Sequence, residues 1–283
     1  MRPRVLRACA GLLALSLALT ACNGDDEGID DPATEEDATT DDAVEDAAGE
    51  DLELVADDTL TVCSDVPYPP FEFEDEDAPS GYSGFDIDLV QEIADRMDLE
   101  LSVLETGFDG LQSGATLAAG QCDLAASAMT ISEERAENLN FSEPYYDAEQ
   151  SLIVLVDSDV ASLEDVAGES LGVQGQTTGA AYAEEHAPDD TEIVEFDQGP
   201  DIYTGMLAGQ VVAGLQDLPV NLERAEEDER FEVVETFETG EQYGFAAALD
   251  NDALIAAVDE HLAGMRDDGT YDEIHDRYFA IDD

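Results

Sequence analysis

Residues 86–129 read DIDLVQEIADRMDLELSVLETGFDGLQSGATLAAGQCDLAASAM. In this stretch, segments whose apolar residues recur at helical spacing alternate with short apolar runs typical of strands. The first twelve residues repeat apolar side chains at helical spacing, and Asp86 stands where an acidic residue caps a helix N-terminus. The stretch predicts a helix at 86–97, a strand at 101–105, a helix at 109–120 and a buried strand at 122–129. With the strand LTVCSD before it, the order is β-α-β-α-β, which predicts a parallel sheet covered by helices on both faces.

The second half of the chain repeats this alternation. Short apolar runs and helical segments follow one another, and two helices end the chain. The predicted strands are 151–156, 170–174, 191–196, 211–217 and 231–236, and the predicted helices are 162–168, 178–187, 201–210, 218–228, 251–269 and 270–280. The segment 243–249 stands between the last strand and the last two helices. Two α/β lobes joined by extended segments account most simply for this order. The expected crossings between the lobes lie near 146–152 and 242–245.

The start of the chain, MRPRVLRACAGLLALSLALTAC, has the features of an export signal. Three arginines precede an apolar run at 8–19 that is too short to span a bilayer. The run ends in Leu-Thr-Ala-Cys, which resembles a bacterial lipobox, so residues 1–21 are predicted to be a signal peptide and Cys22 a lipidated N-terminus that anchors the protein to a membrane. An ordinary signal peptide with a chance cysteine is the alternative.

Residues 22–58 differ in composition from everything that follows. They contain no aromatic side chain, few large apolar ones and many Asp and Glu residues. Such a segment cannot bury enough surface to fold, and its like charges extend it. It is therefore predicted to be a disordered tether, with folded structure beginning near Thr59.

Net charge narrows the possible partners. The chain has 72 Asp and Glu residues against nine arginines and no lysine, for a formal charge of −63. Such a surface repels nucleic acid and anionic lipid head groups, so neither is an expected partner. An acidic, lysine-free surface suits a halophilic setting, because about 1 M salt screens self-repulsion within about 3 Å. The histidines, His186, His261 and His275, are not spaced as metal ligands, and no cofactor is expected.

Two cysteines remain once the leader is removed and Cys22 is lipidated. They are Cys63 and Cys122. An even pair in an exported chain is typical of a disulfide. Two small buried thiols in neighbouring strands are the alternative, because strand spacing permits a bridge only where the registers match. The sequence leaves both possibilities open.

Residues at the carboxyl ends of the predicted strands form a candidate site, because open parallel sheets bind ligands at that edge. They are Asp65, Tyr68, Phe108, Ser127, Ala128 and Thr130 in the first lobe, and Thr177, Thr178 and Asp217 in the second. If the two edges face each other, they make a cleft together with Arg135. That cleft would hold one cation, two acids, several hydroxyls and two aromatic walls.

Four separated motifs carry a resemblance to a known family. They are PYPPFEFED with GYSGFDIDL, SAMTISEERAENLNFSEPYY, GVQGQTTGAAY and DDGTYDEIHDRYF. In order and spacing they resemble the extracellular solute-binding proteins of family 3, the amino-acid receptors of ABC importers. The resemblance implies a two-lobed α/β fold of the periplasmic-binding-protein type II kind with a hinge. Residues 59–147 and 246–283 would form lobe 1, and residues 148–245 would form lobe 2.

The resemblance also implies how a ligand carboxylate is held. Arg135 would fork onto the α-carboxylate, helped by Thr130 and by the backbone N–H of Thr178. A planar guanidinium suits a carboxylate better than an ammonium does, and the helix N-terminus at Thr178 favours an anion. The alternative for Arg135 is an ordinary surface ion pair with Glu133 or Glu134.

The remaining candidates are assigned by the same resemblance. Asp217 and a backbone carbonyl near Ala128 would hold the α-ammonium of the ligand, and Ser127 would add a polar contact. Tyr68 and Phe108 would enclose the ligand side chain.

Asp65 indicates the ligand class. The resemblance places an acid here in members that take basic amino acids or glutamine, and a carboxylate repels acidic ligands. A cationic amino acid is expected first and glutamine second. The expected protein is a monomeric, lipid-anchored receptor at the extracellular face of the cell membrane, not an enzyme, that serves an ABC permease. A sensory surface protein and an exported dehydratase-like enzyme on the same scaffold are the alternatives.

Overall fold

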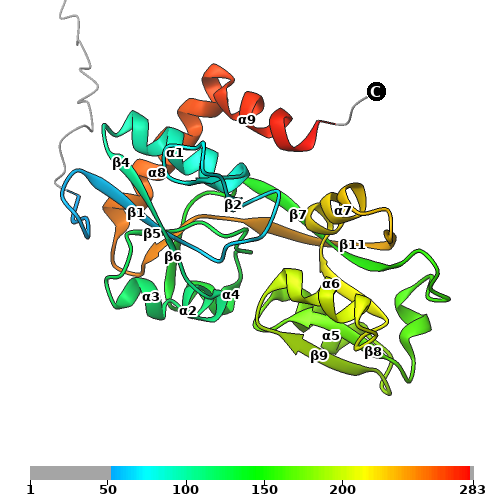
Figure 1. The fold of residues 1–283 in the computed structure, drawn as a ribbon. Coiled ribbons are helices and arrows are strands. Elements are labelled where there is room, and N and C mark those ends of the chain that lie inside the picture. Colours follow the sequence, from blue (N-terminus) through cyan, green and yellow to red (C-terminus); the bar gives the residue numbers. More distant parts are fainter. Residues whose placement is uncertain (1–51, 281–283) are drawn as a thin grey trace, which may run out of the picture. The chain divides into compact units, whose positions relative to one another are not determined.

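The computed structural model describes residues 52–280, which belong to one compact unit. Within this part the chain forms two lobes, each built on its own five-stranded sheet (Figure 1). The predicted signal peptide, Cys22 and most of the predicted tether lie outside the described residues. No helix in the described part has the length and apolar composition needed to cross a membrane.

The sheet of lobe 1 is mixed. Its strand order is β4-β1-β5-β12-β6, and the strands are β1 (Thr59–Ser64), β4 (Glu100–Glu105), β5 (Leu124–Ala125), β6 (Leu139–Phe141) and β12 (Ala246–Ala248). β1 pairs in parallel with β4 and β5, as predicted, whereas β12 runs antiparallel to β5 and β6. The prediction of a parallel β-α-β-α-β unit is therefore confirmed, and β12, which lies outside that unit, is antiparallel because it enters the sheet on the chain's return from lobe 2.

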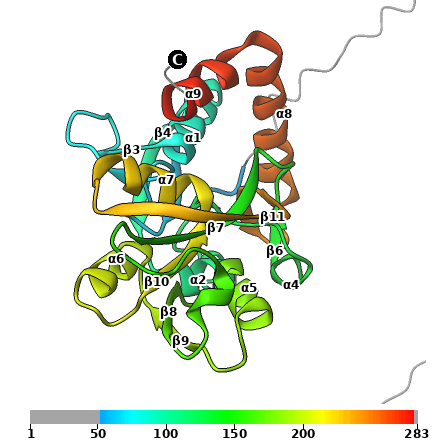
Figure 2. The same cartoon turned by 90° about the vertical axis from the view of Figure 1, so that its right-hand side faces the viewer.

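The sheet of lobe 2 is also mixed. Its strand order is β11-β7-β10-β8-β9, and the strands are β7 (Tyr146–Leu155), β8 (Ser170–Gln174), β9 (Glu192–Phe196), β10 (Ala213–Asp217) and β11 (Phe231–Tyr243). β8 is parallel to β9 and β10, whereas β7 is antiparallel to β10 and β11. The long strands β7 and β11 lie side by side and connect the lobes (Figures 1 and 2).

Helices cover both sheets. Lobe 1 contains α1 (Phe85–Arg96), α2 (Phe108–Gln112), α3 (Ala115–Ala118), α4 (Glu133–Ala136), α8 (Asp252–Asp268) and α9 (Thr270–Phe279), with a small hairpin of β2 (Phe73–Glu74) and β3 (Tyr82–Ser83). Lobe 2 contains α5 (Thr178–His186), α6 (Gly199–Leu207), α7 (Leu218–Glu227) and the 3₁₀ turn η1 (Leu163–Val166).

Two helix predictions need correction. The segment predicted as one helix at 109–120 forms α2 and α3, because Gly114 between them has φ 74°, a left-handed conformation that ends the first helix. Asp86 does not cap α1: it lies inside the first turn, after the N-cap Gly84, and its side chain is fully buried. One Asp86 oxygen accepts hydrogen bonds from the Ala128 N–H at 2.8 Å and the Tyr145 hydroxyl at 2.6 Å.

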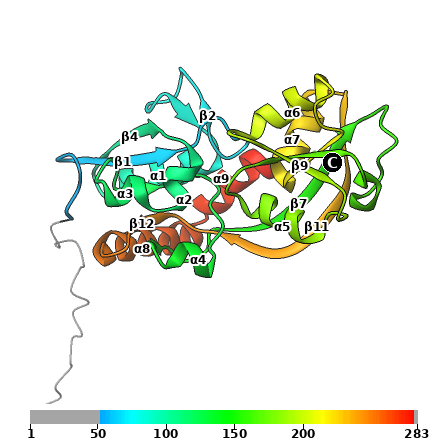
Figure 3. The same cartoon turned by 90° about the horizontal axis from the view of Figure 1, so that it is seen from below.

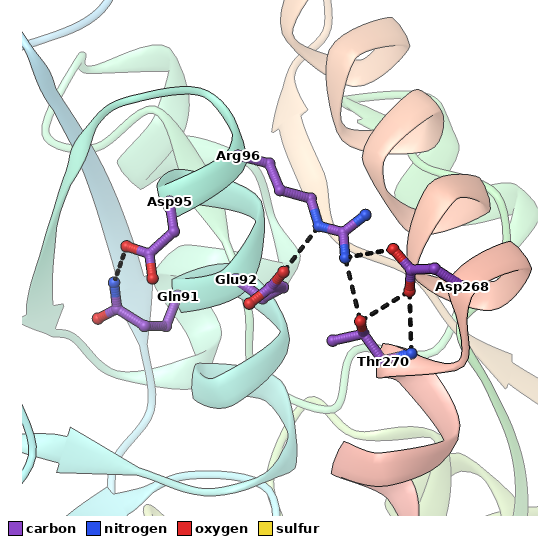
Figure 4. Close-up of polar contacts among 6 residues, drawn as sticks. All are labelled: Gln91, Glu92, Asp95, Arg96, Asp268 and Thr270. Atoms are coloured by element: carbon purple, nitrogen blue, oxygen red, sulfur yellow. Dashed lines mark hydrogen bonds and ion pairs between the residues drawn. The ribbon is translucent and has the colours of Figure 1, made fainter.

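The C-terminal helices pack on the first helix of lobe 1. Both α8 and α9 contact α1, and Figure 4 shows the polar contacts at this junction. Arg96 donates to Glu92 at 2.8 Å, to Asp268 at 2.9 Å and to Thr270 at 3.1 Å. One arginine therefore connects the end of α1 to the turn between α8 and α9. Because the pair with Asp268 is partly exposed, it stabilises the fold by at most about 1 kcal/mol.

Cys63 and Cys122 form a disulfide, with their Cα atoms 5.8 Å apart. Cys63 lies in β1, whose register places it opposite Ala125 of β5. Cys122 stands two residues before β5. The bridge therefore fixes the two neighbouring strands after which Asp65 and Ser127 follow.

The end of the predicted tether contacts lobe 1. Leu52 and Leu54 pack against its hydrophobic core, and the Val55 N–H donates to Asp123 Oδ1 at 2.6 Å. The other oxygen of Asp123 accepts the Thr61 N–H at 2.8 Å. The folded unit therefore begins before the first strand.

Candidate functional site

A cavity lies where the strand ends of the two lobes meet. It is lined by all ten cavity residues selected from the sequence and by one that was missed: Asp65, Tyr68, Phe108, Ser127, Ala128, Thr130, Arg135, Thr177, Thr178, Asp217 and the missed Gln174. In Figure 3, α2 of lobe 1 and α5 of lobe 2 face each other across this region. That these residues contact a ligand stays a prediction.

Arg135 reaches the cavity from the short helix α4. Ser132 caps this helix, with its hydroxyl accepting the Arg135 backbone N–H at 3.2 Å. The guanidinium donates from Nη1 to the Thr130 carbonyl at 2.9 Å and from Nη2 to the Gln176 carbonyl at 3.3 Å. It also lies over the Phe108 ring, 5.1 Å from the centroid. Backbone and ring contacts on both lobes thus hold the guanidinium in place.

No carboxylate of the described residues pairs with Arg135, although its side chain is only 5% exposed. The alternative ion pair with Glu133 or Glu134 is not formed. Arg96, by contrast, has such partners. Burial lowers the pKa of Arg135, and the negative charge of Asp217 is the largest effect that opposes this shift. The site therefore contains a desolvated cation that would gain free energy from an anion.

Asp217 supplies a carboxylate to the same cavity from the end of β10. Its Oδ2 accepts the Tyr68 hydroxyl of lobe 1 at 2.7 Å, and its Oδ1 accepts the Gln150 amide at 2.6 Å. Burial raises the pKa of Asp217 to about 6, and the hydrogen bond from Tyr68 opposes this shift. Above that pH the group is a carboxylate with neutral donors only, so it can still accept a cation.

Asp65 follows β1 and meets Gln174 of lobe 2. The Gln174 amide donates to Asp65 Oδ2 at 2.7 Å, whereas Asp65 Oδ1 is buried without a partner. Burial raises the pKa of Asp65 to about 6. Gln174 is the last residue of β8, at the strand edge that supplied the other candidates. It was missed because only residues beyond that strand were selected.

Ser127 and Ala128 form the wall that follows β5. The Ser127 hydroxyl donates to Glu72 Oε1 at 2.6 Å and accepts the Asp65 N–H at 3.0 Å. Its hydrogen is therefore used within the protein, and only a lone pair is left for a ligand. Ala128 has φ 42°, which is left-handed and unusual for a residue with a side chain.

All three threonines of the site line the cavity, and one of them also caps a helix. Thr177 is the N-cap of α5: its hydroxyl accepts the Ala180 N–H at 3.1 Å and donates to the Gln174 carbonyl at 2.8 Å. Thr178 begins the helix, and its hydroxyl lies 3.3 Å from that of Thr130. The pairs Thr130–Thr178, Asp65–Gln174 and Tyr68–Asp217 all join lobe 1 to lobe 2, so the lobes are in contact around the cavity.

A family model described as bacterial extracellular solute-binding proteins, family 3, matches residues 60–281. The histidine-binding periplasmic protein of Escherichia coli (strain K12) is 29% identical over 233 residues, which cover 79% of this chain and 88% of that protein. The ABC transporter glutamine-binding protein GlnH of Bacillus subtilis (strain 168) is 31% identical over 204 residues, which cover 70% and 73%.

Solved structures of amino-acid-binding proteins are also similar to this chain. An ancestral arginine-binding protein bound to arginine superimposes with a TM-score of 0.73 and 32% sequence identity, over 78% of this chain and 98% of that chain. The expected two-lobed α/β binding-protein fold is therefore confirmed.

Proposed function

The chain belongs to the bacterial extracellular solute-binding proteins, family 3, and we propose that it binds one free amino acid in the cavity between its lobes. The names of its relatives, which refer to histidine, glutamine and arginine, support this ligand class. A cationic amino acid is the first candidate ligand, and glutamine is the second.

One observation carries the proposal: Arg135 and Asp217 line the same cavity, and neither forms an ion pair within the described residues. An α-amino acid carries a carboxylate and an ammonium on one carbon. It can therefore pair with both groups at once. Because an unpaired buried charge costs more free energy than a paired one, the gain on binding is largest for a ligand with both charges.

Asp65, which lines the same cavity, favours a ligand with a donor side chain. Asp65 holds one oxygen toward Gln174 and leaves the other without a partner. A guanidinium, ammonium or amide can donate to that oxygen, whereas a ligand carboxylate would be repelled. Tyr68 and Phe108 supply ring faces along which an alkyl stem or a flat guanidinium can lie. Aspartate and glutamate are the least suited ligands.

A thermal-shift screen of the twenty amino acids with ornithine, citrulline and cystine, at high salt, tests this function. A ligand at a hundred times its Kd adds about 2.7 kcal/mol of stability, which raises the Tm of a chain of this size by roughly 5–10 °C. We expect arginine, lysine or ornithine to give the largest shift and glutamate none. If no amino acid shifts the Tm, the proposal is wrong.

Delivery to an ABC permease and attachment to the membrane complete the proposal. The lipobox-like sequence supports lipidation at Cys22, so the monomeric receptor would sit at the extracellular face of the cell membrane on an acidic tether. Mass spectrometry of the native protein should find a diacylglyceryl group on Cys22, and an unmodified N-terminal peptide would contradict the anchor. A receptor that senses its ligand without transport would lack a co-expressed permease.

A dehydratase-like enzyme is the second candidate. Burial raises the pKa of Asp65 to about 6, close to the range in which a general acid works best. Asp217 weakens this candidate, because a substrate without an ammonium would leave it unpaired. Incubation with a prephenate-like acid decides between the two: a binding protein leaves the compound unchanged, and an enzyme releases water and carbon dioxide from it as the ring becomes aromatic.

A further inference from the structure

Two buried acids lie behind the cavity wall without a cation. Glu72 and Asp86 are both 0% exposed, and neither lines the cavity. No arginine or histidine of residues 52–280 forms an ion pair with either one. One oxygen of each carboxyl group, Glu72 Oε2 and Asp86 Oδ1, also has no hydrogen-bond partner. Burying such an acid costs free energy that only hydrogen bonds or a paired charge offset. Two such acids at one place therefore indicate a role for them.

Their remaining oxygens contact two consecutive cavity residues. Glu72 Oε1 accepts the Ser127 hydroxyl at 2.6 Å. Asp86 Oδ2 accepts the Ala128 backbone N–H at 2.8 Å and the Tyr145 hydroxyl at 2.6 Å. One acid therefore fixes a side chain of the wall, and the other fixes the backbone.

The backbone contact with Asp86 is made by a residue in a strained backbone conformation. Ala128 has φ 42°, a left-handed conformation that a residue with a Cβ adopts at an energetic cost. A hydrogen bond to an ionised acceptor is stronger than one to a neutral acceptor. Asp86 is thus placed to stabilise this conformation, and Ala128 stays at the cavity surface because of it.

We propose that Glu72 and Asp86 are positioning residues for ligand binding, which hold Ser127 and Ala128 in the conformation that lines the cavity. This inference rests on the proposed function, since it concerns the same cavity. It adds two residues that do not touch the ligand themselves and act through the wall in front of them.

The charges of the pair make the wall sensitive to alkaline pH. Burial, helped by the negative charge of Asp86, raises the pKa of Glu72 well above its usual range. Burial raises the pKa of Asp86 to about 7, although bonds from Tyr145 and Ala128 oppose this shift. The hydrogen bond from Ser127 opposes this rise in the pKa of Glu72, and the negative charges of Asp65 and Asp217 add to it. Glu72 therefore keeps its proton to a higher pH than an exposed glutamate does, and its ionisation would place two like charges behind the wall.

Four variants test the proposal, with L-arginine as the probe. Asp86→Ala removes the acceptor, Asp86→Asn keeps its shape without its charge, and Glu72→Gln mimics the neutral acid. The control is Asp123→Ala in the same lobe, because Asp123 is also buried and also accepts two hydrogen bonds, here from the backbone N–H groups of Val55 and Thr61, but does not line the cavity. Calorimetry gives Kd, and hydrogen exchange of residues 126–130 in the ligand-free protein reports on the wall itself.

We expect Asp86→Ala to raise Kd tenfold or more and to speed exchange of the Ala128 amide, and Asp86→Asn to change both readouts in the same direction by a smaller amount, because its neutral oxygen is a weaker acceptor. Asp123→Ala should lower the Tm and leave both readouts unchanged. Equal Kd values and equal exchange in wild type and Asp86→Ala would overturn the proposal. If Asp86→Ala does not fold, equal Kd values and equal exchange in wild type and Asp86→Asn would overturn it instead.

The pH profile separates positioning from simple stabilisation. Across the alkaline range in which the protein stays folded, the Kd of wild type should rise more than that of Glu72→Gln, because glutamine cannot ionise and the ligand's own titration cancels in the ratio. A constant ratio over this range would contradict the proposal. If wild type binds no amino acid, the proposed function fails, but the exchange experiment on the ligand-free variants still decides the positioning role.

Discussion

Replacing Arg135 with alanine should weaken ligand binding far more than it weakens the fold. In the native site the guanidinium is 5% exposed and its donors reach only the carbonyl oxygens of Thr130 and Gln176. A ligand carboxylate that enters the variant site would be desolvated without its partner, which costs on the order of 2–5 kcal/mol. This corresponds to a Kd raised roughly thirty- to several-thousand-fold.

The effect on stability should be small. Burial lowers the pKa of Arg135. The charged guanidinium therefore costs the folded state free energy. Removal of the charge relieves that cost and offsets the loss of two hydrogen bonds and of the contact with the Phe108 ring. The free energy of unfolding should therefore change by no more than about 1–2 kcal/mol.

Calorimetric titration with arginine and with glutamine at high salt measures the effect on Kd. Arg230→Ala is the matched control, because Arg230 is exposed, lies in lobe 2 and pairs with Asp228. Arg135→Lys should fall between wild type and Arg135→Ala, since it keeps a charge but loses the planar fork. A loss of less than threefold in Arg135→Ala would remove this residue from the site and refute the reasoning.

Three further predictions concern specificity, the disulfide and pH. Asp65→Asn should raise the Kd of a cationic ligand tenfold or more, about 1.4 kcal/mol, and affect glutamine less; equal effects in calorimetry would contradict the role of Asp65. Cys63→Ala with Cys122→Ala opens a bridge between residues 59 positions apart and should lower the free energy of unfolding by about 2–4 kcal/mol, and an unchanged denaturant midpoint would count against this. Burial raises the pKa of three acids in the folded protein to about 6 for Asp65, 7 for Asp86 and 6 for Asp217. They keep protons that the unfolded chain has lost, so the free energy of unfolding should fall as pH rises from about 4 to 7. A denaturant midpoint that rises over this range would refute the prediction.

Much of the site could be read from the strand ends. The rule that ligands bind at the carboxyl edge of parallel strands selected Asp65, Ser127 and Asp217, and the two lobes bring these residues to one cavity. The rule works because β1 with β5 and β8 with β10 are parallel pairs, so their ends meet at the same edge of each sheet.

What the sequence did not reveal depends on tertiary contacts. An acid in the first turn of a helix usually stabilises its N-terminus, and the strand pattern gives no sign that Asp86 instead meets the Ala128 N–H 42 residues away. Gln174 ends its strand as any polar residue might, and only the approach of lobe 2 brings its amide to Asp65. The disulfide required the actual register of β1 against β5, which composition does not contain.

The pairing of both ligand charges is tested most directly by comparing arginine with agmatine, the amine that remains when arginine loses its α-carboxylate. Both compounds keep the guanidinium, so both can reach Asp65, but only arginine offers an anion to Arg135. The account predicts that calorimetry of the wild-type protein finds tight binding of arginine and a Kd for agmatine at least thirtyfold higher, about 2 kcal/mol. Agmatine that binds as tightly as arginine would contradict it.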